Sequence, residues 1–296
     1  MLINDASNDN TLEVMEVFKS QASIPVTIVD VAPNEQFWGS KKYALTLGIK
    51  AAQYEHLLLT DADCIPNSEN WIQEMTKGYS QKKAIVLGYG GYKKINNSFL
   101  NKLIRFETVI TALHYFSFAK FGIPYMGVGR NLSYKKSLFY SVNGFIDHMK
   151  VKSGDDDLFI NQVATGTNTD YCTSQFGFTL STPKEYFKDW IVQKRRHIST
   201  ANHYKFKHQF LLGLHFVSQL LFWVLAAIVL SINIQVLNVA ILMGVKLLIS
   251  YLVIGFAMKK FKESDLVIFI PFYSLFLIFM HLFIFIKNLI SKPTNW

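Results

Sequence analysis

Three long apolar stretches near the C-terminus limit what this chain can fold into. They cover residues 210–232, 236–258 and 266–290. Each is long enough to cross a bilayer, for which about 20 apolar residues suffice. The chain is 50% hydrophobic, and the excess lies in this last third, which argues for membrane helices rather than an oversized soluble core. Residues 201–296 are therefore predicted to form a membrane region with about three transmembrane helices.

The distribution of basic residues predicts how these helices are oriented. The net charge is +9, and no zinc-ligand spacing, helix-turn-helix pattern or RNA-binding signature accompanies it, so we expect membrane lipids rather than nucleic acid as a partner. The loop between the first two stretches is uncharged, whereas the segment before them and the next loop are basic: Arg195, Arg196, Lys205, Lys207, Lys259, Lys260 and Lys262. Because basic loops stay in the cytoplasm, we expect a multi-pass protein of the cell membrane with a cytoplasmic N-terminal domain. Lys287 and Lys292 fall on the opposite side in this arrangement.

The first 200 residues alternate between strand-like and helix-like segments. Strands are predicted at 25–30, just before Asp61 and at 84–89, and helices at 12–21, 41–52 and 71–79. This alternation is typical of an α/β layer fold. A further amphipathic helix is predicted at 99–121, where Arg105 and Glu107 exclude a membrane span. It can be a core helix or lie in the membrane interface.

Two aspartates follow the run Leu57-Leu58-Leu59, which reads as a buried strand. Ligands of open α/β sheets lie at the carboxyl ends of strands, and residues two apart in an extended chain point to the same side. Asp61 and Asp63 are therefore predicted to converge on one hard cation, Mg²⁺ or Mn²⁺. A surface turn with acidic residues is the alternative, because Asp-x-Asp alone is a weak motif. Cys64 and Cys172 form no metal-binding pattern.

Two later clusters also carry chemistry. The adjacent carboxylates of Asp155, Asp156 and Asp157 repel one another unless a metal, another cation or water relieves them. An exposed acidic helix start is the alternative, since Asp favours the first turn of a helix. Further along, Arg196 can hold a phosphate through the fork of its guanidinium, or the run around it is a basic segment beside the membrane.

The order of these motifs resembles that of the membrane-bound family 2 glycosyltransferases, the branch that includes cellulose, hyaluronan and poly-N-acetylglucosamine synthases. Residues 4–11, Asn-Asp-Ala-Ser-Asn-Asp-Asn-Thr, resemble the family's nucleotide motif Asp-Asp-Gly-Ser-x-Asp-x-Thr, and residues 61–63 resemble its Asp-x-Asp. The stretch at Asp155 is similar to Glu-Asp-x-Asp-Leu, and residues 193–197, Gln-Lys-Arg-Arg-His, to Gln-x-x-Arg-Trp. Each motif alone is weak, and the ordered set is strong.

The resemblance implies a GT-A fold, a Rossmann-like nucleotide-diphospho-sugar transferase domain, over residues 1–200. It also implies roles on the donor side. Asp5 would contact the nucleotide, and so would Lys41, which follows Gly39 much as a lysine follows a glycine in the family. Asp61 and Asp63 would hold the ribose and the cation-bound diphosphate.

On the acceptor side, the resemblance makes Asp155 the general base that deprotonates the acceptor hydroxyl, or Asp156 if the register slips by one. Gln193 and Arg196 would line the acceptor and pyrophosphate side. The chain departs from the family's pattern at Gly154, where Glu is usual, and at His197, where Trp is usual.

These features together predict an inverting, metal-dependent glycosyltransferase. It would move a sugar from a nucleotide-diphosphate donor to a lipid-linked or polysaccharide acceptor at the cytoplasmic face of the membrane. The family's first strand and helix have no counterpart before Met1. The alternative is therefore a truncated, non-catalytic membrane relative that acts only as a binding or scaffold protein.

Overall fold

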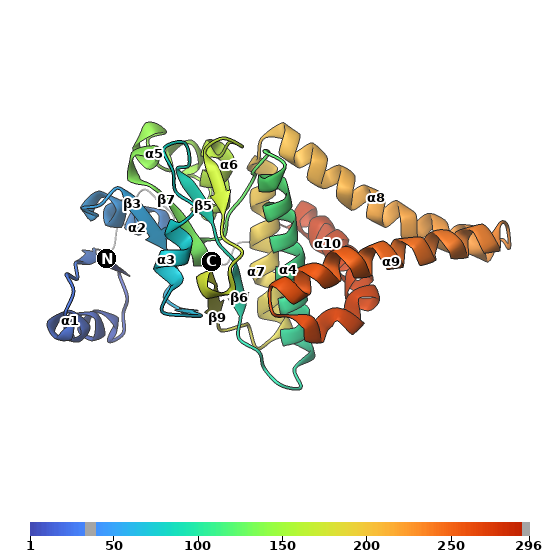
Figure 1. Ribbon diagram of the computed structural model, residues 1–296, viewed down its shortest axis with the longest axis horizontal. Helices are drawn as coiled ribbons and strands as arrows, with labels where there is room; N and C mark the ends of the chain where they lie inside the picture. The colour runs from blue at the N-terminus through green and yellow to red at the C-terminus, as the bar shows by residue number, and fades with distance from the viewer. Residues whose placement is uncertain (33–39, 292–296) are drawn as a thin grey trace.

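The computed structural model describes residues 1–32 and 40–291, which form an α/β domain followed by long apolar helices (Figure 1). The strands are β1 (Leu2–Asp5), β2 (Ile28–Val31), β3 (His56–Leu59), β4 (Cys64–Pro66), β5 (Ile85–Leu87), β6 (Gly90–Tyr92), β7 (Leu132–Lys135), β8 (Thr169–Tyr171) and β9 (Thr179–Ser181). The helices of this domain are α1 (Thr11–Gln21), α2 (Ser40–Ala51), α3 (Trp71–Thr76), α4 (Phe99–Lys120), α5 (Lys136–Ser141), α6 (Asp157–Val163) and α7 (Phe187–Thr200). The C-terminal helices are α8 (Phe206–Ser231), α9 (Val236–Lys260) and α10 (Ile270–Ile290). The alternating strands and helices confirm the predicted α/β class.

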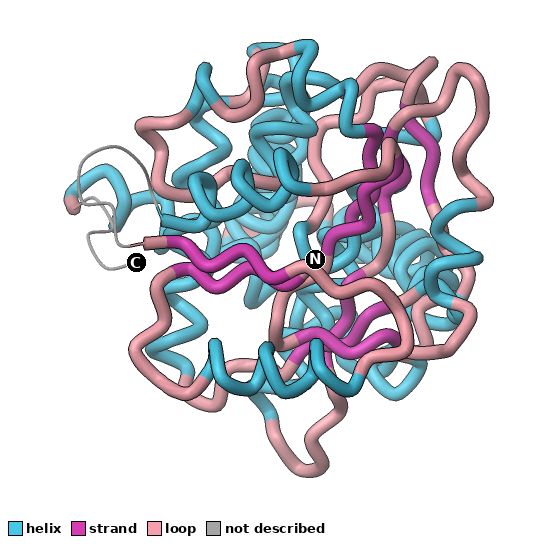
Figure 2. Tube along the Cα trace, turned by 90° about the vertical axis from the view of Figure 1, so that its left-hand side faces the viewer, coloured by secondary structure: helices cyan, strands magenta, loops and turns pink. Residues whose placement is uncertain are grey.

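The strands fall into three groups. A four-stranded sheet has the order β3-β7-β5-β8, in which β7 runs antiparallel to both neighbours and β8 runs parallel to β5. A three-stranded sheet has the order β4-β9-β6. The parallel pair β1 and β2 lies apart from both sheets and is at the front of the view in Figure 2, next to the N-terminus. The pair β1 and β2 forms an N-terminal unit, and the two larger sheets form a central unit.

Helix α2 connects the N-terminal unit to the centre because it packs on β1 and β2. Gly48 allows the close approach: a Cβ at that position would lie 2.2 Å from Cδ1 of Ile3. A larger residue would require the Ile3 side chain or the helix to shift. Since Lys41 lies at the start of α2, this packing also fixes the position of a predicted site residue.

Strand β3 differs from the prediction of a fully buried strand. It is an edge strand that pairs with β7 alone, and its residues are exposed or half-buried. The apolar run before Asp61 is therefore only half-buried, with Leu57 and Leu59 packed on one face and Leu58 on the other. The hydrophobicity of a short run did not distinguish an edge strand from a central one, because periodicity over four residues carries too little information.

Helix α4 resolves an alternative that the sequence left open, because it runs through the hydrophobic core. Leu103, Phe106 and Val109 are fully buried in it, whereas Phe121 at its C-terminal end is exposed. The same core continues without a break into the C-terminal helices, where Tyr273 belongs to it. The predicted division of the chain at residue 200 stays a prediction, but the packing of the apolar residues crosses it.

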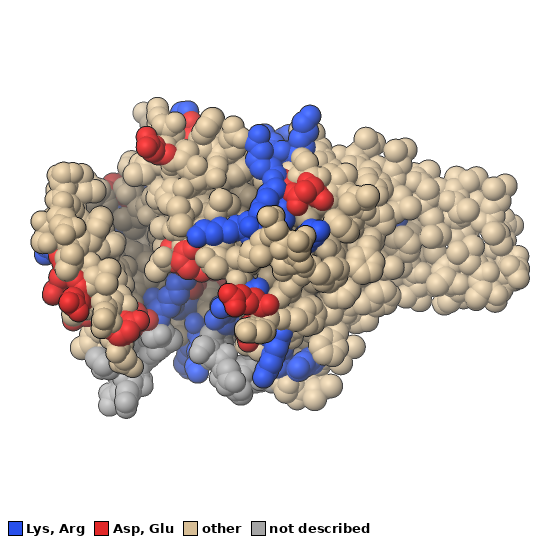
Figure 3. Space-filling model, turned by 90° about the horizontal axis from the view of Figure 1, so that it is seen from below, with Lys and Arg blue, Asp and Glu red and all other residues tan. Residues whose placement is uncertain are grey.

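Three C-terminal helices are long and apolar enough to cross a membrane: Phe206–Ser231, Val236–Lys260 and Ser264–Ile290. In α8 and α9, none of the most apolar window is buried in the protein, whereas 22% of the corresponding window of α10 is. Helices α8 and α9 form a hairpin that extends away from the α/β domain (Figure 1). On the face drawn in Figure 3, the far part of this hairpin shows only uncharged residues.

Candidate active site

Lys41 links two of the predicted acidic motifs. Its Nζ lies 3.0 Å from Oδ1 of Asp61 and 3.0 Å from Oδ2 of Asp155. The three residues come from separate segments: the first turn of α2, the turn after β3 and the loop before α6. Although burial lowers it, the negative charges of Asp155 and Asp61 raise the pKa of Lys41 above its ordinary value, so the lysine stays charged.

The Asp-x-Asp residues do converge, although not through an extended strand. Residues 62 and 63 form a turn, closed by the backbone hydrogen bond of 3.0 Å from Cys64 N to Asp61 O. The turn places ligand atoms of Asp61, Asp63 and Cys64 within 4.8 Å of one another. The structure thus has a feature of each alternative that the sequence left open: it is an acidic turn, and its two carboxylates are close enough to share a cation.

The donor atoms of this turn fit a hard divalent cation through the two aspartates rather than through the cysteine. Carboxylate oxygens are the ligands that Mg²⁺ and Mn²⁺ prefer. The Cys64 sulfur lies 3.0 Å from the hydroxyl of Ser181, and burial raises the pKa of the thiol. A protonated thiol is a poor ligand. Asp61 and Asp63 are thus the candidate metal ligands in the described part of the chain.

The three adjacent aspartates have different environments. Asp156 caps α6, accepting bonds of 2.7 Å from the N–H groups of Asp157 and Gly129. Asp157 is buried and accepts from the hydroxyls of Thr200, at 2.5 Å, and Tyr204, at 2.7 Å. Asp155 is the residue that meets Lys41. The predicted cluster therefore contains a helix cap, a structural acceptor and one carboxylate that faces the Asp-x-Asp turn.

Burial and the neighbouring charges of Asp155 and Asp157 raise the pKa of Asp156 to about 7. Burial also raises the pKa of Asp157, against the two hydroxyls that lower it. Burial is the main cause for both carboxyl groups, and the crowding of like charges adds to it. Lys41 acts in the opposite direction, since its positive charge favours the ionised form of Asp156.

Lys42 holds the loop that carries the acidic cluster, a role that the sequence gave no reason to expect. Its side chain is fully buried, and Nζ donates to the backbone carbonyls of His148, at 2.7 Å, and Val151, at 2.8 Å. Burial lowers the pKa of Lys42 to about 8. Lys41 and Lys42 are adjacent in sequence, and one is exposed while the other is buried. Nothing in the spacing of the lysines along the helix indicates which of the two is buried.

A second buried residue missed from the sequence is Asn131, which joins the two larger sheets. Its side-chain amide donates to the carbonyls of Tyr89, at 3.0 Å, and Gly177, at 2.7 Å, and its oxygen accepts from the indole of Trp71. Next to it, the Arg130 guanidinium stacks on Tyr92, 4.3 Å from the ring centroid. These contacts fix the ends of β5 and β7 beside the Asp-x-Asp turn.

Helix α7 carries the remaining predicted residues, Gln193 and Arg196. Both are half-buried and share a helical face with Thr200, which contacts Asp157. This spacing directs their face toward the start of α6. Their neighbours have structural partners elsewhere: Lys194 Nζ lies 2.6 Å from Oε1 of Glu107.

Asp5 lies apart from these residues. It pairs with Val31 in the register of β1 and β2, and no interaction recorded among residues 1–32 and 40–291 joins it to Lys41 or to the Asp-x-Asp turn. Gly39, which precedes Ser40 and Lys41 in the predicted nucleotide motif, lies outside the described residues. The assignment of Asp5 to the nucleotide stays a prediction.

The fold and the acidic site define a class, the GT-A nucleotide-sugar transferases with attached membrane helices. The family model described as glycosyl transferase family 2 matches residues 1–150, half of the chain. The chain therefore belongs to glycosyl transferase family 2 and is a glycosyltransferase.

Among solved structures, the fold is similar to that of mannosyltransferase PcManGT from Pyrobaculum calidifontis, solved in complex with GDP-Man and Mn²⁺. The TM-score is 0.53 at 15% sequence identity, and the match covers 92% of this chain and 76% of that one. At this identity the match shows the fold, and it confirms the predicted GT-A domain. A comparison with curated proteins gives no match.

Proposed function

We propose that the chain transfers a sugar, with inversion at the anomeric carbon, from a nucleotide-diphosphate donor to a lipid-linked or polysaccharide acceptor. The reaction would take place at the cytoplasmic face of the cell membrane. The observation that carries the proposal is the bridge from Lys41 to Asp61 and Asp155, with both distances 3.0 Å. It brings a donor-side motif and a candidate base together from distant parts of the chain.

On the donor side, Asp61 and Asp63 would hold a Mg²⁺ or Mn²⁺ ion, which would neutralise charge on the departing diphosphate. Lys41 is 55% exposed, so its ammonium can turn from the two carboxylates toward a phosphate when a nucleotide binds. Asp5 would contact the nucleotide from the N-terminal unit. The Pyrobaculum protein was solved with GDP-Man and Mn²⁺, which makes GDP-mannose the first donor to test.

On the acceptor side, the assignment of the base follows from what each carboxylate already does. Both oxygens of Asp156 accept backbone N–H groups, and Asp157 is taken up by Thr200 and Tyr204. Asp155 faces the Asp-x-Asp turn and is therefore the better candidate, with Asp156 as the alternative. A base that takes the acceptor proton opposite the leaving diphosphate gives inversion.

Gln193 and Arg196 would complete the site from α7. They share a helical face with Thr200, which donates a hydrogen bond to Asp157 of the acidic cluster. A guanidinium in this position is suited to the pyrophosphate, and the amide to an acceptor hydroxyl. The half-exposed position of both residues leaves them able to reach a ligand.

The test is a transfer assay with membranes from cells that express the full chain. A panel of radiolabelled nucleotide sugars, with GDP-mannose first, would be incubated with Mn²⁺, and label would be followed into lipid extract and polymer. We expect one donor to give Mn²⁺-dependent transfer that the Asp155→Asn variant lacks. If no donor gives label above the level of that variant, the proposed reaction is wrong.

A further inference from the structure

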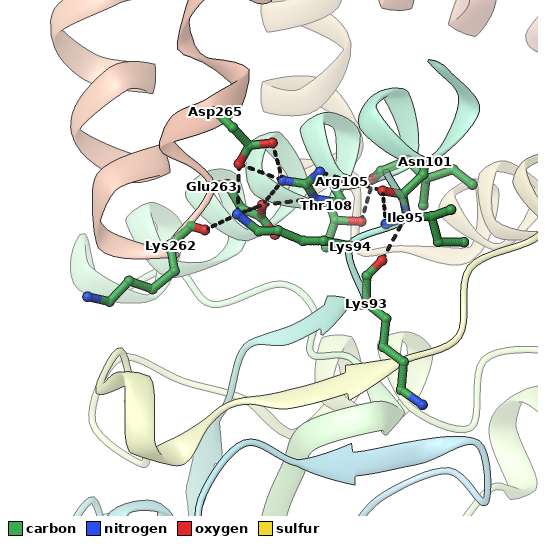
Figure 4. Close-up of polar contacts among 10 residues, drawn as sticks. Lys93, Lys94, Ile95, Asn101, Arg105, Thr108, Lys262, Glu263 and Asp265 are labelled. Atoms are coloured by element: carbon green, nitrogen blue, oxygen red, sulfur yellow. Dashed lines mark hydrogen bonds and ion pairs between the residues drawn. The ribbon is translucent and has the colours of Figure 1, made fainter. Parts of the chain in front are cut away.

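A cluster of ion pairs connects the N-terminal end of α10 to the α/β domain (Figure 4). Arg105 of α4 donates from Nε to Glu263 at 2.9 Å and from Nη2 to Asp265 at 2.6 Å. Glu263 and Asp265 lie in the connection between α9 and α10. One turn into α10, Tyr273 is fully buried, with its ring 5.2 Å from that of Phe106.

The other end of α10 is tied to the same domain. Arg195 of α7 donates to the side chain of Asn288 at 2.9 Å, and Asn288 donates back to the Arg195 carbonyl at 3.0 Å. Arg195 also binds Ser291, the first residue after α10. Between the two ends, Ile284 is fully buried. Helix α7 itself is joined to the acidic cluster through Thr200.

These two attachments conflict with a helix that crosses the bilayer. The 21 residues of α10 extend over about 30 Å, the thickness of the hydrocarbon core. A spanning helix that begins beside the α/β domain would end on the far side, out of reach of that domain. In Figure 1, α10 instead lies beside α4 and α7 and runs across the direction of the α8–α9 hairpin.

The two faces of α10 also differ in what covers them. Ile270, Tyr273, Leu277 and Ile284 form a stripe at helical spacing that packs into the protein. The opposite face is apolar and exposed over the whole length of the helix, at Phe272, Phe279, Phe283, Ile286 and Ile290. An exposed apolar stripe of this length requires an apolar partner. The adjoining hairpin has no charged residue from 208 to 245, and its helices are long and apolar enough to cross a bilayer.

We propose that α10 does not cross the membrane. It lies along the base of the α/β domain with its outer stripe in the adjacent lipid leaflet, and the hairpin of α8 and α9 alone crosses. This arrangement places Lys287 on the same side as Lys259, Lys260 and Lys262, as the distribution of basic residues requires. A helix that exposes one apolar face to lipid, while its other face is covered, lies in the plane of the membrane interface. The proposal concerns topology and holds whether or not the sugar transfer proposed above is correct.

Single-cysteine labelling of the full chain in oriented membrane vesicles tests it. With Cys64→Ser and Cys172→Ser as background, the variants Lys77→Cys, Asn233→Cys and Ser291→Cys report on the α/β domain, the hairpin tip and the end of α10. A membrane-impermeant maleimide should label Lys77→Cys and Ser291→Cys from one side and Asn233→Cys from the other. Labelling of Ser291→Cys from the side of Asn233→Cys would overturn the proposal.

Two further measurements check the side on which α10 ends and whether lipid covers its outer stripe. An epitope tag after Trp296 on the chain with its cysteines intact should be cut by protease from the side of the α/β domain. In the labelling experiment, Phe283→Cys should resist the impermeant maleimide from both sides and react once detergent dissolves the bilayer. Labelling of Phe283→Cys in sealed vesicles from the domain side would show that water, not lipid, covers the stripe.

Discussion

Two clusters in this molecule each join a cation to two carboxylates, and the two cations differ in exposure. In one, Lys41 meets Asp61 and Asp155, and in the other, Arg105 meets Glu263 and Asp265. The side chains of Lys41 and Asp61 are 55% and 34% exposed, whereas those of Arg105 and Glu263 are 2% and 4% exposed. The third member of each set differs from the other two: Asp155 is 11% exposed and Asp265 is 43% exposed. The two sets therefore respond differently to the loss of a partner.

The exposed set can exchange partners at little cost. An ion pair in contact with water contributes about 0–1 kcal/mol, so Lys41 can release either carboxylate to a cation or a phosphate. In the buried set, removal of Arg105 leaves the buried carboxylate of Glu263 with only Lys94, 3.4 Å away, and the loss of a buried partner costs several kcal/mol. We infer that the first set serves ligands and the second holds α10 against the α/β domain. The following predictions test this contrast, from the largest expected effect to the smallest.

Asp63→Asn should reduce transfer to background and weaken Mn²⁺-dependent nucleotide binding. The variant keeps the shape of the turn and removes one of two carboxylates suited to a hard cation. Transfer and nucleotide binding would be measured with and without a chelator. Cys64→Ser is the matched control in the same turn and should keep its dependence on Mn²⁺. Full activity of Asp63→Asn in the presence of chelator would refute the metal assignment.

Asp155→Asn should lower turnover by about 10²–10⁴-fold, the usual contribution of a general base. Nucleotide binding should persist, because the donor contacts lie elsewhere, and stability should change by less than about 0.5 kcal/mol. Asp156→Asn tests the slipped register, and Asp157→Asn should act on stability through the lost bonds to Thr200 and Tyr204. Near-normal turnover in both Asp155→Asn and Asp156→Asn would exclude the proposed base.

Arg105→Ala should destabilise the folded protein by about 3 kcal/mol, because the buried Glu263 loses its buried partner and keeps only the half-exposed Lys94, 3.4 Å away. Thermal unfolding in detergent would measure the loss. The double variant with Glu263→Ala should recover part of it, since the uncompensated charge is then gone. If the single variant unfolds like the native protein, the cluster does not hold α10 in place.

The pH dependence of stability should change in Asp156→Asn. A carboxyl whose folded-state pKa is raised from 3.8 to about 7 holds its proton more tightly in the folded protein. The protonated carboxyl therefore contributes fully to the free energy of unfolding below pH 3.8, and this contribution is lost as the pH rises to about 7. The variant lacks this titration, so its unfolding free energy should fall less than that of the native chain between these pH values. Parallel pH curves for the two proteins would contradict the raised pKa.

Lys94→Ala should have the smallest effect, below about 1 kcal/mol. Lys94 reaches the same carboxylates as Arg105, at 2.7 Å from Asp265, but its side chain is 50% exposed. It is thus the matched control for Arg105→Ala within one cluster. A loss as large as that of Arg105→Ala would show that exposure does not govern these ion pairs.

At the Asp-x-Asp motif, the two carboxylates come together as expected from the sequence, but through a different local geometry, and the bound cation stays a prediction. The sequence predicted that Asp61 and Asp63 would converge because an extended chain directs alternate residues to one side. They do converge, but through a turn closed by Cys64. The turn could not be read from the sequence, since the direction of the chain after β3 depends on pairing between β4 and β9, more than 100 residues away in sequence.

The amino-acid sequence by itself determined the class of this protein. Alternating strands and helices, an ordered set of acidic motifs and three apolar stretches were enough to indicate a GT-A domain with membrane helices. These are local signals, because periodicity and composition act within about 20 residues.

Only the tertiary structure decided which residues meet and which apolar stretches pack against the α/β domain. Lys41 joins Asp61 and Asp155, and Lys42 holds the loop next to them, through contacts between segments about 20 to 110 residues apart in sequence. Helices α8, α9 and α10 are alike in composition, yet α10 alone is attached to the α/β domain at both ends. The hydrophobic effect depends on how much apolar area is removed from water, and not on what covers that area. An apolar sequence therefore specifies that a helix is buried, but not whether protein or lipid buries it.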